Sequence, residues 1–358
     1  MESMNTIKRK ETISNSNLLF AIAAVIFVLM YGFAILSFPH SFLQAQTFFD
    51  LFNLNAPLII VTLGVSIVMI GGGIDISVGQ VTALVTMSCA VFLQSGTGSV
   101  GGSMLLALGI GIAFGLLQGF LVAYLKIQPF IITLAGMFLA SGLLTTIHKD
   151  PLNVTMPDFV HLRDFEIVIP WLGTTNRLGN FIPLEIKPGA IVVLVLVVVL
   201  VIVMHWSRFG RNLYAVGGNY QSALMLGINV KRTKFYSHVL CGLLSGIAGF
   251  VFIMITGAGN VGNASGFEIK AIAGSIIGGT LLIGGVGNLI GSPVGALTLL
   301  TINELIRAAG VNSNFQAIAS GMLLCVFIVL QSGVLWLRGT DSFKLALPAW
   351  LLPSRKGR

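Results

Sequence analysis

The residues best suited to chemistry directly follow three consecutive glycines, 71–73, inside a long apolar stretch. Asp75, Ser77 and Gln80 supply a carboxylate, a hydroxyl and an amide, which together donate and accept hydrogen bonds to a polar solute. Polar groups at membrane depth are unfavourable unless they are paired or bind something. For Asp75 a second interpretation is equally open, because Asp caps the free amides of a restarting helix. We predict either a substrate contact or a helix cap at Asp75, and a substrate path that includes Ser77 and Gln80.

The sequence lacks the common motifs of catalysis. It contains no GxxxxGK[ST] phosphate loop, no HExxH and no GxSxG, and its five histidines are dispersed. Cys89, Cys241 and Cys325 lie in separate apolar runs, which excludes a disulfide framework and a CxxC metal site. We therefore expect no enzymatic activity, metal or cofactor in this chain, and we expect a separate subunit to bind and hydrolyse any ATP that drives it.

The composition places these residues in a membrane. Of 358 residues, 55% are hydrophobic and 9% are charged, against about 25% charged residues in ordinary soluble domains. The net charge of +8 does not indicate nucleic-acid binding, because the charges fall in short blocks between apolar runs. The sequence predicts an all-α membrane protein that packs in lipid.

The apolar runs predict ten transmembrane helices between a tail at 1–17 and a tail at 338–358. Residues 56–91 form two of these spans, because glycines 71–73 and Asp75 interrupt an otherwise overlong run. Inside segments would carry fourteen Lys and Arg residues and outside segments six, which predicts that both termini are cytoplasmic. The other spans are predicted at 18–38, 104–125, 129–147, 190–206, 237–256, 269–283, 289–306 and 317–337.

Two long connections join these spans within the transmembrane domain, 18–337. The external one, 148–188, could receive an outside partner or could pack over the outer mouth as a lid. The cytoplasmic one, 207–236, is basic. Its middle, 219–228, predicts a short amphipathic helix that ends at Gly227.

Glycines recur at every fourth position in two places. One set is Gly111, Gly115 and Gly119, and the other is Gly287, Gly291 and Gly295. Each set would lie on one face of a helix and allow close helix approach in lipid. We favour helix packing over a glycine-lined pathway for both sets.

The source of energy separates two classes of function. Ion-driven carriers usually hold several ionisable residues at mid-membrane, where Asp75 is nearly alone in this sequence. The second class is a transporter driven by a separate ATPase subunit. A short rigid helix that projects between spans could transmit the movement of such a subunit to the membrane helices. The alternative is a stand-alone secondary carrier or channel for a small polar solute.

Four segments are similar to the membrane permeases of monosaccharide ABC importers, the ribose, xylose, arabinose and galactofuranose group. Together they extend over nearly the whole transmembrane region, and the chain most resembles a galactofuranose importer permease. The segments are 71–79 (GGGIDISVG), 129–137 (PFIITLAGM), 208–227 (RFGRNLYAVGGNYQSALMLG) and 276–287 (IIGGTLLIGGVG).

The resemblance implies sugar import by alternating access at a bacterial inner membrane. It implies three partners: an ABC ATP-binding subunit, a second permease chain that is identical or different, and an extracytoplasmic sugar-binding protein. No nucleic acid is expected. It further implies that the segment 219–228 is the coupling helix that docks on the ATPase, with the residues Asn219, Ala223, Leu226, Gly227 and Ile228.

This sequence departs from the family pattern at two places. Tyr220, Gln221 and Ser222 replace the usual Glu-Ala-Ala core of the coupling helix, which changes the expected docking contacts. Lys270 replaces an acid in the segment before the eighth span, which puts the choice of sugar or partner in question.

Overall fold

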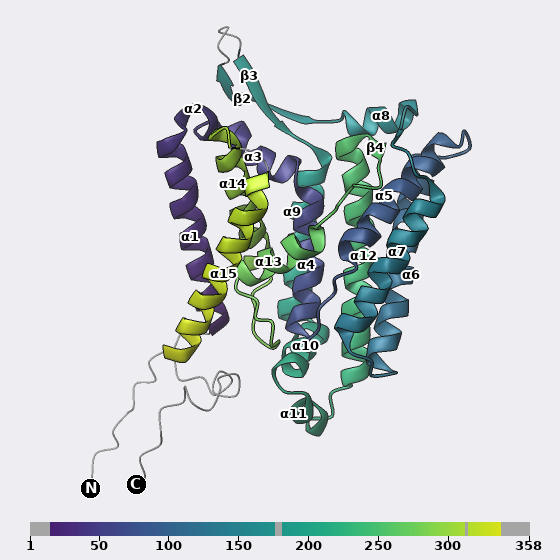
Figure 1. The fold of residues 1–358 in the computed structure, drawn as a ribbon, viewed down its shortest axis with the longest axis vertical. Coiled ribbons are helices and arrows are strands. Elements are labelled where there is room, and N and C mark those ends of the chain that lie inside the picture. The colour runs from purple at the N-terminus through teal and green to yellow at the C-terminus, as the bar shows by residue number, and fades with distance from the viewer. Residues whose placement is uncertain (1–14, 176–180, 312–313, 338–358) are drawn as a thin grey trace.

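The longest apolar runs fold as continuous helices, because a helix satisfies its own backbone hydrogen bonds where water is absent. The computed structural model describes residues 15–175, 181–311 and 314–337. In this part of the chain, five helices are long and apolar enough to cross a membrane (Figure 1). They are α1 (Asn15–Ser37), α6 (Val100–Ala123), α7 (Pro129–Ile147), α9 (Pro188–Trp206) and α12 (Val230–Thr256).

The remaining helices do not meet this criterion as single helices. α3 (Ala45–Asn53) and α4 (Ala56–Ile70) meet at an angle of 58° and together form a sixth candidate span. Each of the ten predicted apolar segments contains a helix, but the number of crossings stays a prediction. The others are α2 (Pro39–Phe42), α5 (Val78–Gln94), α13 (Phe267–Ile277), α14 (Gly291–Ala308) and α15 (Asn314–Leu337).

The predicted helix over 269–283 is wrong in its second part. α13 ends at Ile277, and residues 278–290 form turns before α14 begins. The helix stops because Gly278 lies directly against the Gly291 backbone and because Gly279 has φ +94°, a left-handed conformation that favours glycine. Gly287 lies in these turns, so the prediction that it shares a helix face with Gly291 and Gly295 is also wrong.

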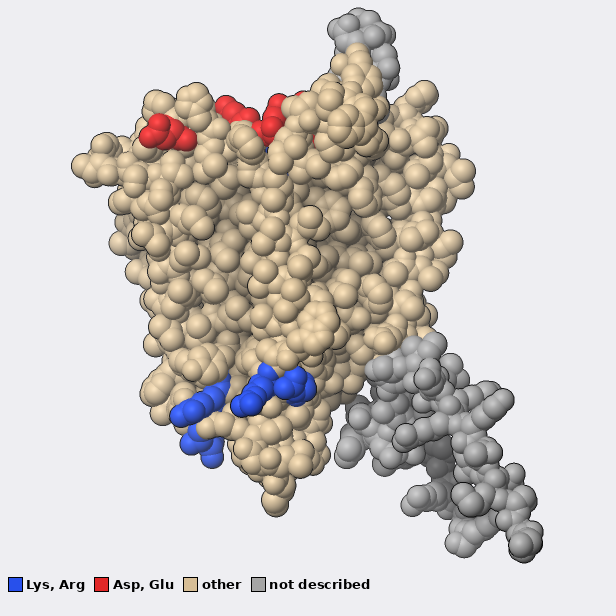
Figure 2. Space-filling model, turned by 180° about the vertical axis from the view of Figure 1, so that it is seen from behind, with Lys and Arg blue, Asp and Glu red and all other residues tan. Residues whose placement is uncertain are grey.

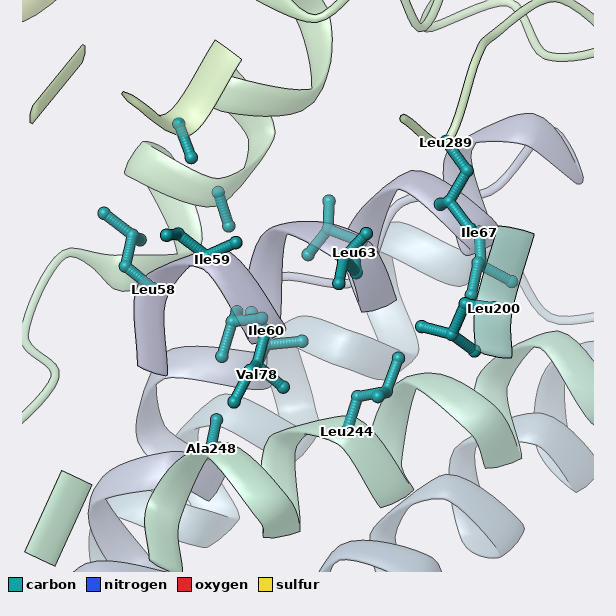
Figure 3. Packing of buried hydrophobic residues seen from close by; sticks show 14 of the residues in the cluster. Leu58, Ile59, Ile60, Leu63, Ile67, Val78, Leu200, Leu244, Ala248 and Leu289 are labelled. Atoms are coloured by element: carbon teal, nitrogen blue, oxygen red, sulfur yellow. The ribbon is translucent and has the colours of Figure 1, made fainter. Parts of the chain in front are cut away.

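α4 is the central helix of the bundle. All fifteen of its residues are buried, as expected for a helix that is apolar on every side. Figure 3 shows Ile60, Leu63 and Ile67 of α4 among side chains from other helices, including Leu200 of α9 and Leu244 of α12. The break that follows α4 therefore begins inside the core.

The outer helices of the bundle present apolar side chains away from the core. Leu36 of α1 is 84% exposed, and Phe138 of α7 and Leu194 of α9 are also exposed. Exposed large apolar surface of this extent is typical of helices that contact lipid. Localisation in a membrane follows from these faces together with the length of the helices.

Two small antiparallel sheets modify the predicted all-α fold at one end of the bundle. β1 (Leu152–Asn153) pairs with β4 (Ala258–Gly259), and β2 (Ile167–Thr175) pairs with β3 (Phe181–Ile186), with an irregularity between Ile169 and Gly173. α8 (Pro157–Arg163) packs on the bundle through the fully buried Phe159, whereas the β2–β3 hairpin projects away from it (Figure 1). The hairpin is joined to α3 at its base, where Asn53 donates to the Glu185 carbonyl at 2.9 Å. Whether 148–188 acts as a lid or receives a partner stays a prediction.

On the face drawn in Figure 2, the two ends of the bundle differ in charge. Figure 2 shows Lys and Arg at the end that carries α10 (Arg208–Gly218) and α11 (Tyr220–Met225), and Asp and Glu at the opposite end. We call the first the basic end and the second the acidic end. The cytoplasmic side of membrane proteins is the side rich in Lys and Arg.

Candidate functional site

Asp75 and Ser77 form a buried hydrogen-bonded turn between α4 and α5. One carboxylate oxygen of Asp75, Oδ1, accepts the Ser77 backbone N–H at 2.9 Å and the Ser77 hydroxyl at 2.7 Å. Ser77 is the cap residue of α5, and both side chains are only 2% exposed. Asp75 therefore fixes the turn before α5 by binding the cap residue, and it is not itself the helix cap that one interpretation of the sequence predicted.

Neighbouring helices fix this turn from three sides. Gln118 of α6 donates its amide N–H to the Ser77 Oγ at 2.8 Å, and Thr133 of α7 donates to the Ile74 carbonyl at 3.3 Å. His238 of α12 is buried and lies close enough to interact electrostatically with Asp75. Sequence reasoning missed Gln118 and His238, since neither belongs to a recognisable motif.

Gln80 differs from the other two predicted path residues in its exposure. Its side chain is partly exposed, as are those of Ile74 and Ile76. Asp75 and Ser77 could bind a solute only if the hydrogen bonds of the turn were broken. Gln80, the third residue predicted for the substrate path, could bind one while the turn stays intact.

Two substitutions of Asp75 distinguish the effect of its hydrogen bonds from the effect of its charge. Asp75→Asn keeps an oxygen that accepts the two Ser77 hydrogens, so we expect a thermal unfolding temperature within about 3 °C of wild type in detergent. Asp75→Ala leaves a buried donor unpaired, which costs about 1–3 kcal/mol, and should unfold clearly earlier. Equal loss in both variants would show that the charge beside His238, and not the pair of hydrogen bonds, stabilises the turn.

The projecting segment 208–229, which we call the elbow, has a side-chain cap at each helix start. Ser207 accepts the Gly210 amide hydrogen at 3.2 Å, Asn219 accepts that of Ser222 at 2.9 Å, and Asn229 accepts that of Arg232 at 3.0 Å. These caps satisfy donors that a helix start leaves free. α12 begins at Val230, so the predicted connection 207–236 is too long by its last turns.

The C-terminal end of α11 is a Schellman motif. The Ile228 amide donates to the Ala223 carbonyl and the Gly227 amide to the Leu224 carbonyl, both at 3.0 Å, and Gly227 has φ +74°. A Cβ at Gly227 would meet no atom within 4 Å. The predicted left-handed helix end is thus present, and its glycine is required for backbone conformation rather than for close packing within the chain.

The faces of α11 divide into an inner and an outer one. Ala223 is 1% exposed and packs against Val216 and Val230, so it supports the elbow from within. Met225 is 88% and Leu226 is 77% exposed. The outward contacts of the predicted coupling helix therefore come from Leu226 and from Met225, and not from Ala223.

The elbow meets two breaks between helices, 71–77 between α4 and α5 and 278–290 between α13 and α14. Five glycines lie at this meeting point: 72, 217, 218, 284 and 285. We call them the glycine junction. The Gly285 amide donates to the Ile70 carbonyl at the end of α4 at 2.9 Å. A Cβ at Gly217 would overlap the same carbonyl, and one at Gly284 would lie 2.7 Å from the Gly72 Cα. Three backbones thus meet, and a side chain at Gly217, Gly284 or Gly285 would push them apart.

A tyrosine holds the same turns from the elbow side. The Tyr214 hydroxyl of α10 donates to the Gly287 carbonyl at 2.9 Å. Burial raises the pKa of Tyr214 to about 12, so the hydroxyl remains a donor at physiological pH. The elbow, the end of α4 and the turns 278–290 therefore form one connected backbone unit.

The repeated glycines lie where helices cross. Gly111, Gly115 and Gly119 of α6 lie against the α12 backbone, where Gly242 and Gly246 face them. Gly291 and Gly295 of α14 lie against Gly274 and Gly278 of α13 in the same way. Close backbone approach of this kind is how helices pack in lipid.

A cluster of three serine hydroxyls links the central helix α4 to α13 and α14. The hydroxyls of Ser66, Ser275 and Ser292 are linked at 2.7 and 2.6 Å, and all three residues are fully buried.

Among the described residues, no group of three or more His, Cys, Asp or Glu side chains could hold a metal ion.

Interrupted helices within an apolar bundle and a rigid elbow at its basic end define an integral membrane transport protein. The chain belongs to the family described as the permease component of branched-chain amino acid transport systems, which matches residues 47–328. It is a multi-pass inner membrane protein of the ABC transporter permease class.

Several relatives are similar over most of their length. The chain is 37% identical to the inner membrane ABC transporter permease protein YjfF of Escherichia coli, over 89% of this chain and 94% of the relative. It is 33% identical to the fructose import permease protein FruG of Bifidobacterium longum, over 88% and 91%. It is 32% identical to the ribose import permease protein RbsC of Bacillus subtilis, over 81% and 86%. No solved structure matches the chain.

Proposed function

We propose that this chain is one of two permease subunits of an ATP-driven monosaccharide importer. The single observation that carries the proposal is the elbow, which exposes Met225 and Leu226 at the basic end and joins the helix breaks through the glycine junction. The fructose and ribose import permeases among the relatives support a monosaccharide as the cargo. Galactofuranose and pentoses are both compatible with this assignment.

Three further subunits complete the proposed machine. An ABC ATP-binding subunit docks on the exposed tip of α11, a second permease chain completes the path, and an extracytoplasmic binding protein delivers the sugar at the acidic end. Closure of the ATPase pushes the elbow, and the elbow moves the breaks at 71–77 and 278–290. Alternating access then requires only that these turns shift between two packed arrangements.

The test is purification of the complex from its native membrane, followed by uptake in vesicles. We expect an ATP-binding subunit and a binding protein to co-purify, and we expect uptake of a labelled monosaccharide to require ATP. Uptake that is driven by a sodium or proton gradient without ATP would favour the stand-alone carrier. Uptake of labelled leucine but of no sugar would assign an amino acid as the cargo.

The proposed topology has ten spans with both termini in the cytoplasm. Cys89, Cys241 and Cys325 are first replaced by serine, because Cys325 is exposed. A membrane-impermeant thiol reagent on intact cells should then label Asp164→Cys at the acidic end and should not label Met225→Cys on the elbow. The reverse pattern would invert the orientation, and labelling of both would contradict the span count.

A further inference from the structure

Glu268 is a carboxylate whose hydrogen-bonding capacity the fold leaves unused. It lies in the first turn of α13, and its Oε2 atom is buried without a hydrogen-bond partner. No ion pair within the described residues includes Glu268. A buried carboxylate oxygen without a donor is unfavourable, and Glu268 as a whole is only half-buried, so part of the residue remains open to a donor from outside the chain.

Gly79 shows how closely this carboxylate is seated. A Cβ at Gly79 would overlap the Glu268 Oε2, and it would lie 3.3 Å from the Glu268 amide nitrogen and 3.1 Å from the Ala264 carbonyl oxygen. Gly79 is the second residue of α5 and Glu268 is the second residue of α13. The first turns of two helices therefore meet at the carboxylate.

Both helices begin inside the bundle instead of at its surface. α5 restarts after the break at 71–77, and the chain descends from β4 at the acidic end to the start of α13 (Figure 1). The amino-terminal end of a helix carries a partial positive charge, which favours a negatively charged side chain in the first turn. Glu268 is thus a charged acceptor placed within the bundle.

The residues around Glu268 are partly exposed. Glu268 itself is half-buried, Gln80 follows Gly79 directly and is also half-buried, and Ile269 on the next position of α13 is 64% exposed. By contrast, Asp75 and Ser77 are occupied with each other and with Gln118. Glu268 offers only acceptors and Gln80 both donates and accepts, a combination that is suited to sugar hydroxyls.

We infer that Glu268 and Gln80 are contacts of this permease with the hydroxyl groups of the transported sugar. The inference rests on the proposed function, because it takes a monosaccharide as the cargo. Glu268 binds a hydroxyl hydrogen through its oxygens, and Gly79 keeps the space that the carboxylate occupies. Asp75 and Ser77 then shape the turn that presents Gln80.

The experiment uses the complete complex with its ATP-binding subunit, second permease and binding protein in proteoliposomes. Labelled D-ribose, D-fructose and D-galactose are offered to wild type, and the transported sugar is then used with Glu268→Gln, which keeps the shape but removes the charge. We expect at least a tenfold lower rate of uptake at subsaturating sugar. The matched control, Glu304→Gln, removes a carboxylate whose partner is the exposed Arg307 at 3.1 Å, and should stay within twofold.

Deoxy analogues separate a sugar contact from a structural role. For the analogue that lacks the hydroxyl bound by Glu268, wild type and Glu268→Gln should differ by less than threefold, because the interaction is already missing. The same tenfold loss for every monodeoxy analogue would overturn the inference, as would uptake by Glu268→Gln at the wild-type rate. If neither Glu268→Gln nor Glu268→Asp assembles, Glu268 is a folding residue and the inference fails. Absence of sugar uptake by wild type would instead contradict the proposed function.

Discussion

Replacement of Met225 and Leu226 together by aspartate is expected to abolish ATP-driven uptake while the permease remains folded. Both side chains project from the tip of α11 with exposed fractions of 88% and 77%, so the change removes no contact within the chain. Burying a large apolar side chain contributes about 1.5–3 kcal/mol. Loss of two such contacts weakens docking of the ATPase by about two to four orders of magnitude, since each 1.4 kcal/mol is tenfold.

The measurement is a detergent pull-down of the ATP-binding subunit, with uptake in vesicles as the second readout. The matched control replaces Lys231 and Arg232 together by glutamine, because it lowers the net charge by the same two units at exposed positions of α12 outside the elbow. We expect this control to bind the ATPase within twofold of wild type. If the double variant retains both binding and uptake, α11 is only a connecting helix, and the stand-alone carrier becomes the better hypothesis.

Gly217→Ala is expected to reduce uptake at least tenfold and to leave the ATPase bound. The added methyl group would overlap the Ile70 carbonyl oxygen, which already accepts the Gly285 amide hydrogen. Overpacking of this kind costs about 1–3 kcal/mol and forces the backbones apart. The elbow would then move without carrying the breaks with it, so ATP hydrolysis should continue while the number of sugars moved per ATP falls.

Gly218→Ala is the control, because it adds the same methyl group one residue further along. Its Cβ would lie 3.9 Å from the Gly285 Cα, which is an ordinary contact. We expect the ratio of sugar transported to ATP hydrolysed to stay within twofold of wild type in this variant. An unchanged ratio in Gly217→Ala would mean that motion passes from the elbow to the membrane by another route.

Local signals in the sequence predicted the helices and the elbow well. Hydropathy located a helix in each of the ten predicted apolar segments, although it missed α3. The glycines at 71–73 located the end of α4 at Ile70, and Gly227 located the end of α11. These features depend on neighbours in sequence, because a helix forms and ends through hydrogen bonds between residues three to five positions apart.

Contacts between distant segments could not be predicted in the same way. The spacing of the glycines predicted that Gly287 and Gly291 share one helix face. In the structure α13 ends where Gly278 packs on Gly291, and Gly287 lies in the turns before α14 begins. The burial of Ala223 likewise depends on Val216 and Val230, which lie outside the segment 219–228. A sequence pattern records which side chains are apolar, but not which backbone approaches them.

By itself, the sequence determined that this protein lies in a membrane, lacks the common catalytic motifs, and has a break after residue 70 and a projecting element near residue 220. Only the tertiary structure decided that Asp75 and Ser77 face inward, that Glu268 lies over Gly79, and that the elbow meets both interrupted helices at glycines. The physical reason is that hydropathy and helix ends are set over a few residues. The direction of a polar side chain and the closeness of two backbones are set by how segments up to about two hundred residues apart pack together.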